Sequence, residues 1–555
     1  MRVDLAIVGA GTMGAGIAQV AATRGLDVVL YDSNPAALER GLTTIYAALG
    51  RGVERGRLSI AEHDAVVARL TAASALADLA AAPIVVEAVP EDLALKQRIF
   101  ADLDSVCAPA TVLATNTSSI SITRIAAATT RPERVVGMHF FNPVWAMTLV
   151  EVVAGELSGE PAAAAVVALA RRMGRTPVRV KDTPGFVVNR VARPYYGEAL
   201  RLLAEGIDVA QTDRILRTGS GLPMGPFELM DLIGIDVNFA VTRSIFDAFF
   251  GEPRYRPHPI QDRMVAAGTL GRKTGRGFYP YGRSGGEGQA QEGEAAGPAP
   301  GTRTRRGGRV YVAGAAGDAL LGFVEVQLAA AGYTVVLQTA GDAGAERSST
   351  LSLAPVVAGL DLWRVLGEER AEAIAGLDES LPPGRPLLSL CNAASTDELA
   401  SYAVRGERVV GFSLFGPLRE GMQAEILPGL GTETGAVQRA AGVLDALGFR
   451  TEVLPSGAWA ILPRVLSLVI NEAAIAVTEG VASAADIDSA MRLGANYPQG
   501  PLALADEIGL GDVLAVLEAL QGEYGDERYR PAPLLRRLVL AGYTGRAVGR
   551  GFHLY

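Results

Sequence analysis

The sequence predicts an α/β fold class in which a parallel-sheet domain and an all-helical domain both occur twice, with a reduced second sheet domain. Three observations lead to this prediction. Short apolar runs typical of buried parallel strands alternate with helical stretches through the first third of the chain. Whole blocks of sequence recur at a fixed distance. A segment poor in apolar residues separates the two copies.

The charge and the cysteine content of the chain indicate which kinds of ligand it binds. The chain has 555 residues and a net charge of -9, which argues against nucleic acid or an anionic membrane as partner, because both repel an acidic surface. Its two cysteines, Cys107 and Cys391, form no disulfide framework and no C-x-x-C metal motif, so we expect no metal site. No apolar run reaches the ~18 residues of a membrane helix, and no leader-like segment is evident. We therefore expect a cytoplasmic protein that binds small molecules.

The duplication is visible by direct comparison of the two halves. Tyr255-Arg256-Pro257 recurs as Tyr529-Arg530-Pro531, and Gly275-Arg276-Gly277-Phe278 recurs as Gly549-Arg550-Gly551-Phe552, both at an offset of 274 residues. Near the start of each half the offset is 307 residues, so the second copy is shorter by 33 residues. The missing part falls within residues 35–79, which read as two amphipathic helices. The second of these helices opens with a capping box formed by Ser59 and Glu62.

These comparisons divide the chain into five segments. They are a nucleotide-binding domain at 1–182, a helical domain at 183–281, a flexible linker at 282–308, a degenerate and shortened sheet domain at 309–453, and a second helical domain at 454–555.

A glycine-rich turn follows the first predicted strand. Residues 3–8 are apolar, Gly9-Ala10-Gly11-Thr12-Met13-Gly14 comes next, a helical run covers 15–24, and a second strand ends on Asp32. This order is typical of a Rossmann-type dinucleotide site, where the glycines admit the pyrophosphate and the acid accepts from a ribose hydroxyl. The acid also repels a 2′-phosphate, so we expect NAD rather than NADP. The alternative is a turn that serves only strand–helix packing.

Further strands are predicted at 84–89, 111–115 and 135–138. Glu91 and Asn116 lie just beyond the first two of them. Since ligands of open parallel sheets bind at the carboxyl ends of the strands, we expect both loops to face the cofactor. The predicted cofactor residues are Gly9, Gly11, Thr12, Met13, Gly14, Asp32, Glu91 and Asn116.

His139, one of only four histidines, stands at the end of the strand at 135–138. Twelve residues later Glu151 interrupts the apolar run 149–153. A carboxylate in such a run costs free energy to bury unless it is paired. His139 is the simplest partner, and Glu151 would then orient it as a base. Taken alone, such a histidine is more often structural, with its hydrogen bonds satisfied, but its position beyond a dinucleotide sheet and the lone buried acid favour a base.

Several ordered blocks resemble the 3-hydroxyacyl-CoA dehydrogenase family of β-oxidation, and together they cover nearly all of residues 1–281. The blocks are the glycine turn, Asn116-Thr117-Ser118-Ser119, His139-Phe140-Phe141-Asn142-Pro143, the run from Lys181 to Arg190, Pro223-Met224-Gly225-Pro226-Phe227-Glu228, and Gly271 to Tyr279. The two-copy layout is similar to the long 3-hydroxybutyryl-CoA or 3-hydroxyadipyl-CoA dehydrogenases of bacterial aromatic-acid (phenylacetate) catabolism.

The resemblance implies a role for each matching residue. It makes His139 the base, Glu151 its supporting acid, and Ser118 and Asn189 the substrate-binding groups of an NAD-dependent oxidation of L-3-hydroxyacyl-CoA. Ser118 could instead cap the helix that follows it, and Asn189 could bond within its own helix, which Pro194 would kink. Arg55 aligns with a lysine that contacts coenzyme A phosphate in the family, although a solvated cation is an equal alternative.

One local departure from the family pattern concerns the substrate. Trp145 stands where the family has small residues or proline, which leaves the acyl preference open. Two other functions remain as alternatives. One is a dehydrogenase of a free hydroxy acid, such as gulonate, and the other is a non-catalytic protein of the lens-crystallin kind.

The second half is predicted to be catalytically silent. At the 274-residue offset, Ser413 stands for His139 and Pro463 for Asn189, and of the catalytic set only Glu151 is retained, as Glu425. The glycine turn has decayed, and Thr339 replaces Asp32. Because the packing residues persist while the chemistry is lost, we expect the two helical domains to form an intramolecular pseudo-dimer, with further homo-oligomerisation left open.

Overall fold

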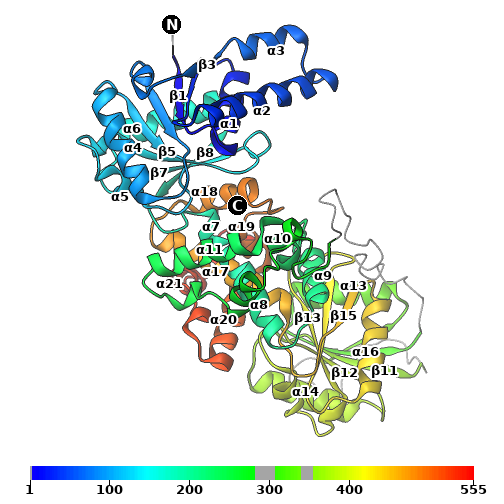
Figure 1. The fold of residues 1–555 in the computed structure, drawn as a ribbon. Coiled ribbons are helices and arrows are strands. Elements are labelled where there is room, and N and C mark those ends of the chain that lie inside the picture. The colour runs from blue at the N-terminus through cyan, green and yellow to red at the C-terminus, as the bar shows by residue number, and fades with distance from the viewer. Residues whose placement is uncertain (1–2, 282–306, 339–353) are drawn as a thin grey trace. The chain divides into compact units, whose positions relative to one another are not determined.

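The computed structural model describes residues 3–281, 307–338 and 354–555 (Figure 1). Most of the predicted linker at 282–308 and Thr339 lie outside these residues. The chain forms two compact units: one contains Met1–Val191, Asp247–Phe250 and Ala476–Gly500, and the other contains Ala192–Phe246, Gly251–Ile475 and Pro501–Tyr555. Each unit therefore combines segments of both halves of the sequence.

The first sheet has eight strands in the order β3-β2-β1-β4-β5-β6-β7-β8, parallel except for the antiparallel pair β6 and β7. The strands are β1 (Leu5–Val8), β2 (Val28–Tyr31), β3 (Leu70–Ala73), β4 (Ile84–Glu87), β5 (Val112–Thr115), β6 (Val135–Phe140), β7 (Leu149–Ala154) and β8 (Thr176–Lys181). The helices are α1 (Thr12–Thr23), α2 (Pro35–Glu54), α3 (Ile60–Val67), α4 (Leu93–Val106), α5 (Ile122–Ala126) and α6 (Glu160–Arg172), with 3-10 turns η1 (Leu76–Leu79) and η2 (Pro132–Arg134).

The predicted α/β class of this domain is confirmed, and two details differ. The capping box of Ser59 and Glu62 starts α3 as predicted. Strand β3 was not expected, because its sequence, LTAA, lacks the apolar character of the central strands and lies at the edge of the sheet. His139 lies inside β6 rather than beyond it, directly opposite Glu151 of β7.

The second sheet repeats this topology without a counterpart of β3 among the described residues. Its order is β10-β9-β11-β12-β13-β14-β15, again with one antiparallel pair, β13 and β14. The strands are β9 (Arg309–Ala313), β10 (Thr334–Gln338), β11 (Val356–Asp361), β12 (Leu387–Leu390), β13 (Val409–Leu414), β14 (Gln423–Pro428) and β15 (Arg450–Val453). The helices are α13 (Ala319–Ala330), α14 (Glu368–Ser380), α15 (Thr396–Ala400) and α16 (Thr434–Ala446), with the turn η5 (Gly406–Arg408).

The helical segments also repeat. The first set is α7 (Val188–Val191), α8 (Arg193–Ala204), α9 (Val209–Ser220), α10 (Pro226–Ile233), α11 (Ile235–Ala248), η3 (Pro253–Tyr255), α12 (Pro259–Ala266) and η4 (Arg272–Thr274). The second set is α17 (Ile461–Thr478), α18 (Ala484–Gly494), α19 (Pro501–Ile508), α20 (Leu510–Tyr524), η6 (Glu527–Tyr529), α21 (Pro533–Leu540) and η7 (Arg546–Val548).

The two sets differ at their first helix. The predicted long helix after Pro184 is interrupted into α7 and α8 at Ala192, whose backbone angles nevertheless stay helical. Pro194 lies in the first turn of α8, where a proline is tolerated because the N–H that it lacks would have no partner within the helix. In the second set α17 is continuous over 18 residues. By length and composition α17 could also cross a membrane, which corrects the expectation that no segment would qualify, but 83% of its window is buried inside the protein.

The contacts between the two sets are reciprocal. The Tyr255 hydroxyl donates to Glu472 at 2.5 Å, and the Tyr529 hydroxyl donates to Glu198 at 2.7 Å. These four residues are two pairs related by the 274-residue offset, so each tyrosine reaches the glutamate of the other set. The two hydrogen bonds are therefore related by the same internal repeat as the sequence.

Candidate active site

The loop from β1 to α1 leaves room for a dinucleotide. Gly9 has φ +102°, and a Cβ there would lie 2.7 Å from the carbonyl oxygen of Ala88. A Cβ on Gly14 would lie 1.8 Å from the Gly9 carbonyl oxygen, so this glycine permits close strand–helix packing. A Cβ on Gly11 would meet nothing within 4 Å. The backbone is therefore open at the N-terminus of α1, where the pyrophosphate of NAD would bind, and the glycines fit that cofactor.

The predicted cofactor residues gather at the carboxyl ends of the strands. Asp32 accepts from the Ala10 amide at 2.9 Å, which ties the end of β2 to the glycine loop. Asn116 Oδ1 accepts from the Phe140 amide at 2.8 Å, which ties the end of β5 to the residue after His139.

Glu91 organises the loop that contains Ser118. Its Oε1 accepts from the Thr117 hydroxyl at 2.6 Å and from the amides of Ser118 and Ser119 at 3.1 and 3.0 Å. Burial would raise the pKa of Glu91, but the charge of Lys96 and these hydrogen bonds outweigh burial and lower it. An ionised Glu91 therefore holds the loop.

Sequence reasoning missed a buried ion pair beneath this loop. Lys96 of α4 is fully buried and donates to Glu87 at the end of β4 at 2.7 Å. The signal was available, because Glu87 is a lone acid in an apolar strand, as Glu151 is. The pair also recurs at the 274-residue offset as Asp361 and Arg370, with an Nε–Oδ2 distance of 2.9 Å.

His139 and Glu151 form the centre of the site. The Nδ1 of His139 lies 2.7 Å from Oε2 of Glu151, and their side chains are 7% and 0% exposed. Phe141 and Phe186 flank the imidazole, with ring centroids 4.5 and 5.7 Å away. Because Glu151 occupies Nδ1, the other ring nitrogen, Nε2, is the one available to exchange a proton with a ligand.

The second oxygen of Glu151 reaches the helix that carries Asn189. Its Oε1 accepts from the amides of Val187 and Val188, both at 3.0 Å. One carboxylate thus joins the imidazole of His139 to the start of α7, and Asn189 is the next residue. The helix-cap alternative for Ser118 is wrong, because Ser121 caps α5 by accepting from the Arg124 amide.

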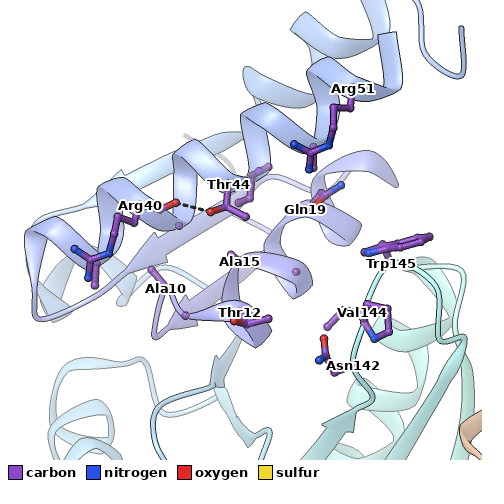
Figure 2. Close-up of a pocket in the computed structure, with 17 residues that line it drawn as sticks. Ala10, Thr12, Ala15, Gln19, Arg40, Thr44, Arg51, Asn142, Val144 and Trp145 are labelled. Carbon is purple, nitrogen blue, oxygen red and sulfur yellow. Dashed lines mark hydrogen bonds between the residues drawn. The ribbon is translucent and has the colours of Figure 1, made fainter. Parts of the chain in front are cut away.

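A pocket of about 460 Å³ lies beside the glycine loop (Figure 2). Arg40 and Arg51 extend into it from α2, and Trp145, with 65% of its surface exposed, stands on the loop after β6. Arg55 is exposed at the C-cap of α2 and is not among the lining residues. The arginines that line this pocket, Arg40 and Arg51, therefore lie at least one helical turn closer to the N-terminus than Arg55, the residue that the sequence suggested.

The second half lacks an equivalent site among its described residues. Ser413 takes the place of His139 and donates to Asn392 at 2.8 Å, while Glu425 still accepts from the amides of Ile461 and Leu462. At the start of α13 the side chain of Asp318 accepts from the Leu320 amide at 2.6 Å and pairs with Arg364 at 2.8 Å. A carboxylate thus occupies the helix end at which a phosphate would bind.

Family models match about two thirds of the chain, namely the first sheet domain and both helical domains. The model described as 3-hydroxyacyl-CoA dehydrogenase, NAD binding domain, matches residues 4–183, and the model for the C-terminal domain of the same enzymes matches both 185–281 and 461–555. The second match of the C-terminal model agrees with the duplication seen in the sequence.

Individual relatives show the same relationship. The chain is 37% identical over 542 residues to a 3-hydroxyadipyl-CoA dehydrogenase of Escherichia coli, covering 97% of this chain and 98% of the relative. It is 45% identical over 279 residues to a probable 3-hydroxybutyryl-CoA dehydrogenase of Bacillus subtilis, covering 50% and 97%. A crystal structure of a 3-hydroxybutyryl-CoA dehydrogenase from Escherichia coli matches with TM-score 0.76 and 37% identity, covering 98% and 100%. The chain belongs to the family of NAD-dependent 3-hydroxyacyl-CoA dehydrogenases.

Proposed function

We propose that the first half oxidises the 3-hydroxyl of an L-3-hydroxyacyl-CoA to a 3-oxoacyl-CoA with His139 as general base. The observation that carries this proposal is the buried pair of His139 and Glu151, whose carboxylate also binds the start of α7. NAD, held at the glycine loop and Asp32, supplies the hydride acceptor when bound.

The protein groups then have separate tasks. His139 Nε2 takes the hydroxyl proton, while Glu151 fixes the ring and stabilises the imidazolium. Ser118 and Asn189 donate to the reacting oxygens and stabilise charge as it develops. Phe141 and Phe186 keep water from the imidazole, which strengthens its interaction with Glu151.

The pocket beside α2 is proposed to hold the coenzyme A portion. Arg40 and Arg51 provide the positive charge for phosphate groups, and Trp145 offers an aromatic face. The substrate is a 3-hydroxybutyryl-CoA or 3-hydroxyadipyl-CoA type of thioester, and a cytoplasmic location fits such a reaction.

The domain arrangement completes the proposal. The helical domains at 183–281 and 454–555 form a pseudo-dimer within one chain, supported by the reciprocal bonds of Tyr255 and Tyr529 to the opposite glutamates. The second half, without a histidine base, serves as a partner for the first.

The duplicated chain offers a matched test. His139→Ala should lower kcat for NADH-linked reduction of acetoacetyl-CoA or 3-oxoadipyl-CoA by at least ~10²-fold with little change in the Kd for NAD, because the base of the oxidation is, in its protonated form, the acid that gives the proton to the carbonyl oxygen in the reduction. The control is Ser413→Ala, which changes the equivalent position in the silent half and should leave kcat unchanged. Near-normal turnover of the His139 variant would refute the assignment. Activity only on free hydroxy acids would refute the substrate class.

A further inference from the structure

Helix α7, which carries Asn189, is four residues long and is followed by the interruption at Ala192. So short a helix has no stability of its own and depends on tertiary contacts. One of these contacts is the pair of amide bonds to Glu151. Further contacts come from residues 476–500, which belong to the second half of the sequence but to the same compact unit as α7.

Arg190, the residue after Asn189, receives the most direct of these contacts. Its side chain is fully buried, and its Nη1 lies 2.7 Å from Oε2 of Glu479. The guanidinium also stacks over Phe249, 5.1 Å from the ring centroid. A buried guanidinium is costly without a counter-charge, so Glu479 fixes where this side chain, and hence α7, can lie.

Helix α18 supports α7 from the same segment. A Cβ on Gly494 would lie 2.6 Å from Cδ2 of Leu149 and 2.9 Å from Cγ2 of Val188. The Lys181 amide donates to the Val481 carbonyl at 2.9 Å, which anchors the turn between Glu479 and α18. The segment is thus held so close to β7, β8 and α7 that a Cβ on residue 494 would displace the side chains of Leu149 and Val188.

We propose that Glu479, acting through Arg190, is a positioning residue for Asn189, so that the silent half of the chain sets the geometry of the active one. The inference rests on the proposed role of Asn189 in substrate binding. Under this proposal, catalysis in the first half depends on the carboxylate of Glu479, which lies in the second half of the sequence.

The duplication supplies a control with the same chemistry. At the 274-residue offset Glu205 corresponds to Glu479 and Arg464 to Arg190, and Glu205 binds Arg464 at 2.6 and 2.8 Å. The two glutamates are exposed to similar extents, 38% for Glu205 and 43% for Glu479. Pro463 precedes Arg464, so the Glu205 pair supports no substrate-binding asparagine.

The experiment compares Glu479→Gln with Glu205→Gln in the full chain, using kcat, KM for acetoacetyl-CoA, Kd for NAD and Tm. Both should lower Tm, and Glu205→Gln should lower it no more than Glu479→Gln does, because Arg464 keeps Glu198 as a partner. Only Glu479→Gln should lower kcat/KM, by about tenfold or more, because a misplacement of about 1 Å in a positioning group can cost up to ~10²-fold. The Kd for NAD should not change, and Glu479→Asp should restore part of the loss.

A double variant distinguishes positioning from general damage. Asn189→Ala removes the side chain that Glu479 is proposed to position. Adding Glu479→Gln to this variant should therefore lower kcat/KM further by less than about twofold. If Glu479→Gln is too unstable to assay, Gly494→Ala and its control Gly219→Ala, whose Cβ would meet Leu462, test the neighbouring support of α7 by α18. Equal losses for the paired variants, or no loss at position 479, would overturn the inference. Unchanged activity of Asn189→Ala would instead show that the proposed role of Asn189 is wrong.

Discussion

Two buried carboxylates, Glu151 and Glu425, occupy equivalent strands and perform different sets of tasks. Each accepts from two successive amides at the start of a helix, at Val187 and Val188 in one case and at Ile461 and Leu462 in the other. Only Glu151 also has an imidazole beside it. Burial of Glu425, without any cation to offset it, raises the pKa of its carboxyl to about 7.

This shift predicts a pH dependence of stability. Since the pKa of Glu425 is about 7 in the folded protein against an ordinary 4.5, the folded state holds a proton that the unfolded state releases between these values. The free energy of unfolding therefore falls as pH rises from 4.5 to 7 and this contribution is constant above pH 7. In Glu425→Gln the part of the slope due to this group should vanish, reducing the stability difference between pH 5.5 and 8 by about 2 kcal/mol at most.

Chemical denaturation at the two pH values measures this difference. Asp213, whose pKa burial also raises to about 7, remains in the variant and contributes a slope of the same sign. A Glu425→Gln protein with the full wild-type slope would show that Glu425 does not titrate in this range.

At the scale of elements, the two strand–loop–helix units β1–α1 and β9–α13 show how a nucleotide site is lost. Gly11 is the N-cap of α1 and has no side chain that could cap the helix. Asp318 is the N-cap of α13, and its carboxylate accepts from the Leu320 amide. The same helix end is thus left open for an anion in one copy and is occupied by the chain's own anion in the other.

Gly11→Asp should convert the first loop into the second. The new carboxylate has room, caps α1 and occupies the place of the pyrophosphate, so Tm should stay the same or rise while the Kd for NAD increases by at least ~10²-fold. Calorimetric titration and thermal unfolding measure the two effects. The control, Asp318→Gly, should lower Tm without changing NAD binding. Unchanged NAD affinity in Gly11→Asp would refute the cofactor assignment of this loop.

For the whole molecule, the contacts between the two helical sets bear on the proposed pseudo-dimer. Glu198, buried in the first helical set, binds Arg464 at 2.5 Å and Tyr529 at 2.7 Å, both from the second set. Removal of the second half would leave this carboxylate with Arg201 alone, 3.6 Å away on the same helix, and loss of the partners of a buried charge is strongly destabilising.

We therefore predict that a chain ending at Tyr281 is inactive as a monomer, and that it regains activity only if two copies associate. The full-length chain should bind one NAD, since Asp318 blocks the second loop. Ultracentrifugation combined with the acetoacetyl-CoA assay tests the first statement, and calorimetric stoichiometry tests the second. A fully active monomeric half, or two NAD per chain, would contradict the pseudo-dimer.

The sequence by itself determined the α/β and helical class, the duplication and the buried pair of His139 and Glu151. These follow from signals that are local or repeated: strand periodicity, the glycine spacing, and the cost of a lone acid such as Glu151 in an apolar run. The ion pair of Glu87 and Lys96 could have been predicted in the same way, because Glu87 is also a lone acid in an apolar run and a buried acid requires a partner.

Only the tertiary structure decided which distant segments support the site. Nothing near Asn189 in the sequence indicates that Arg190 binds Glu479, and nothing in α2 distinguishes Arg51, which lines the pocket, from Arg55, which does not. The edge strand β3 could not be predicted from the sequence either, because its residues show no clear pattern of apolar positions. The physical reason is common to these cases. Long-range ion pairs and helix orientation depend on which surfaces pack together, and that choice belongs to the whole fold rather than to any stretch of sequence.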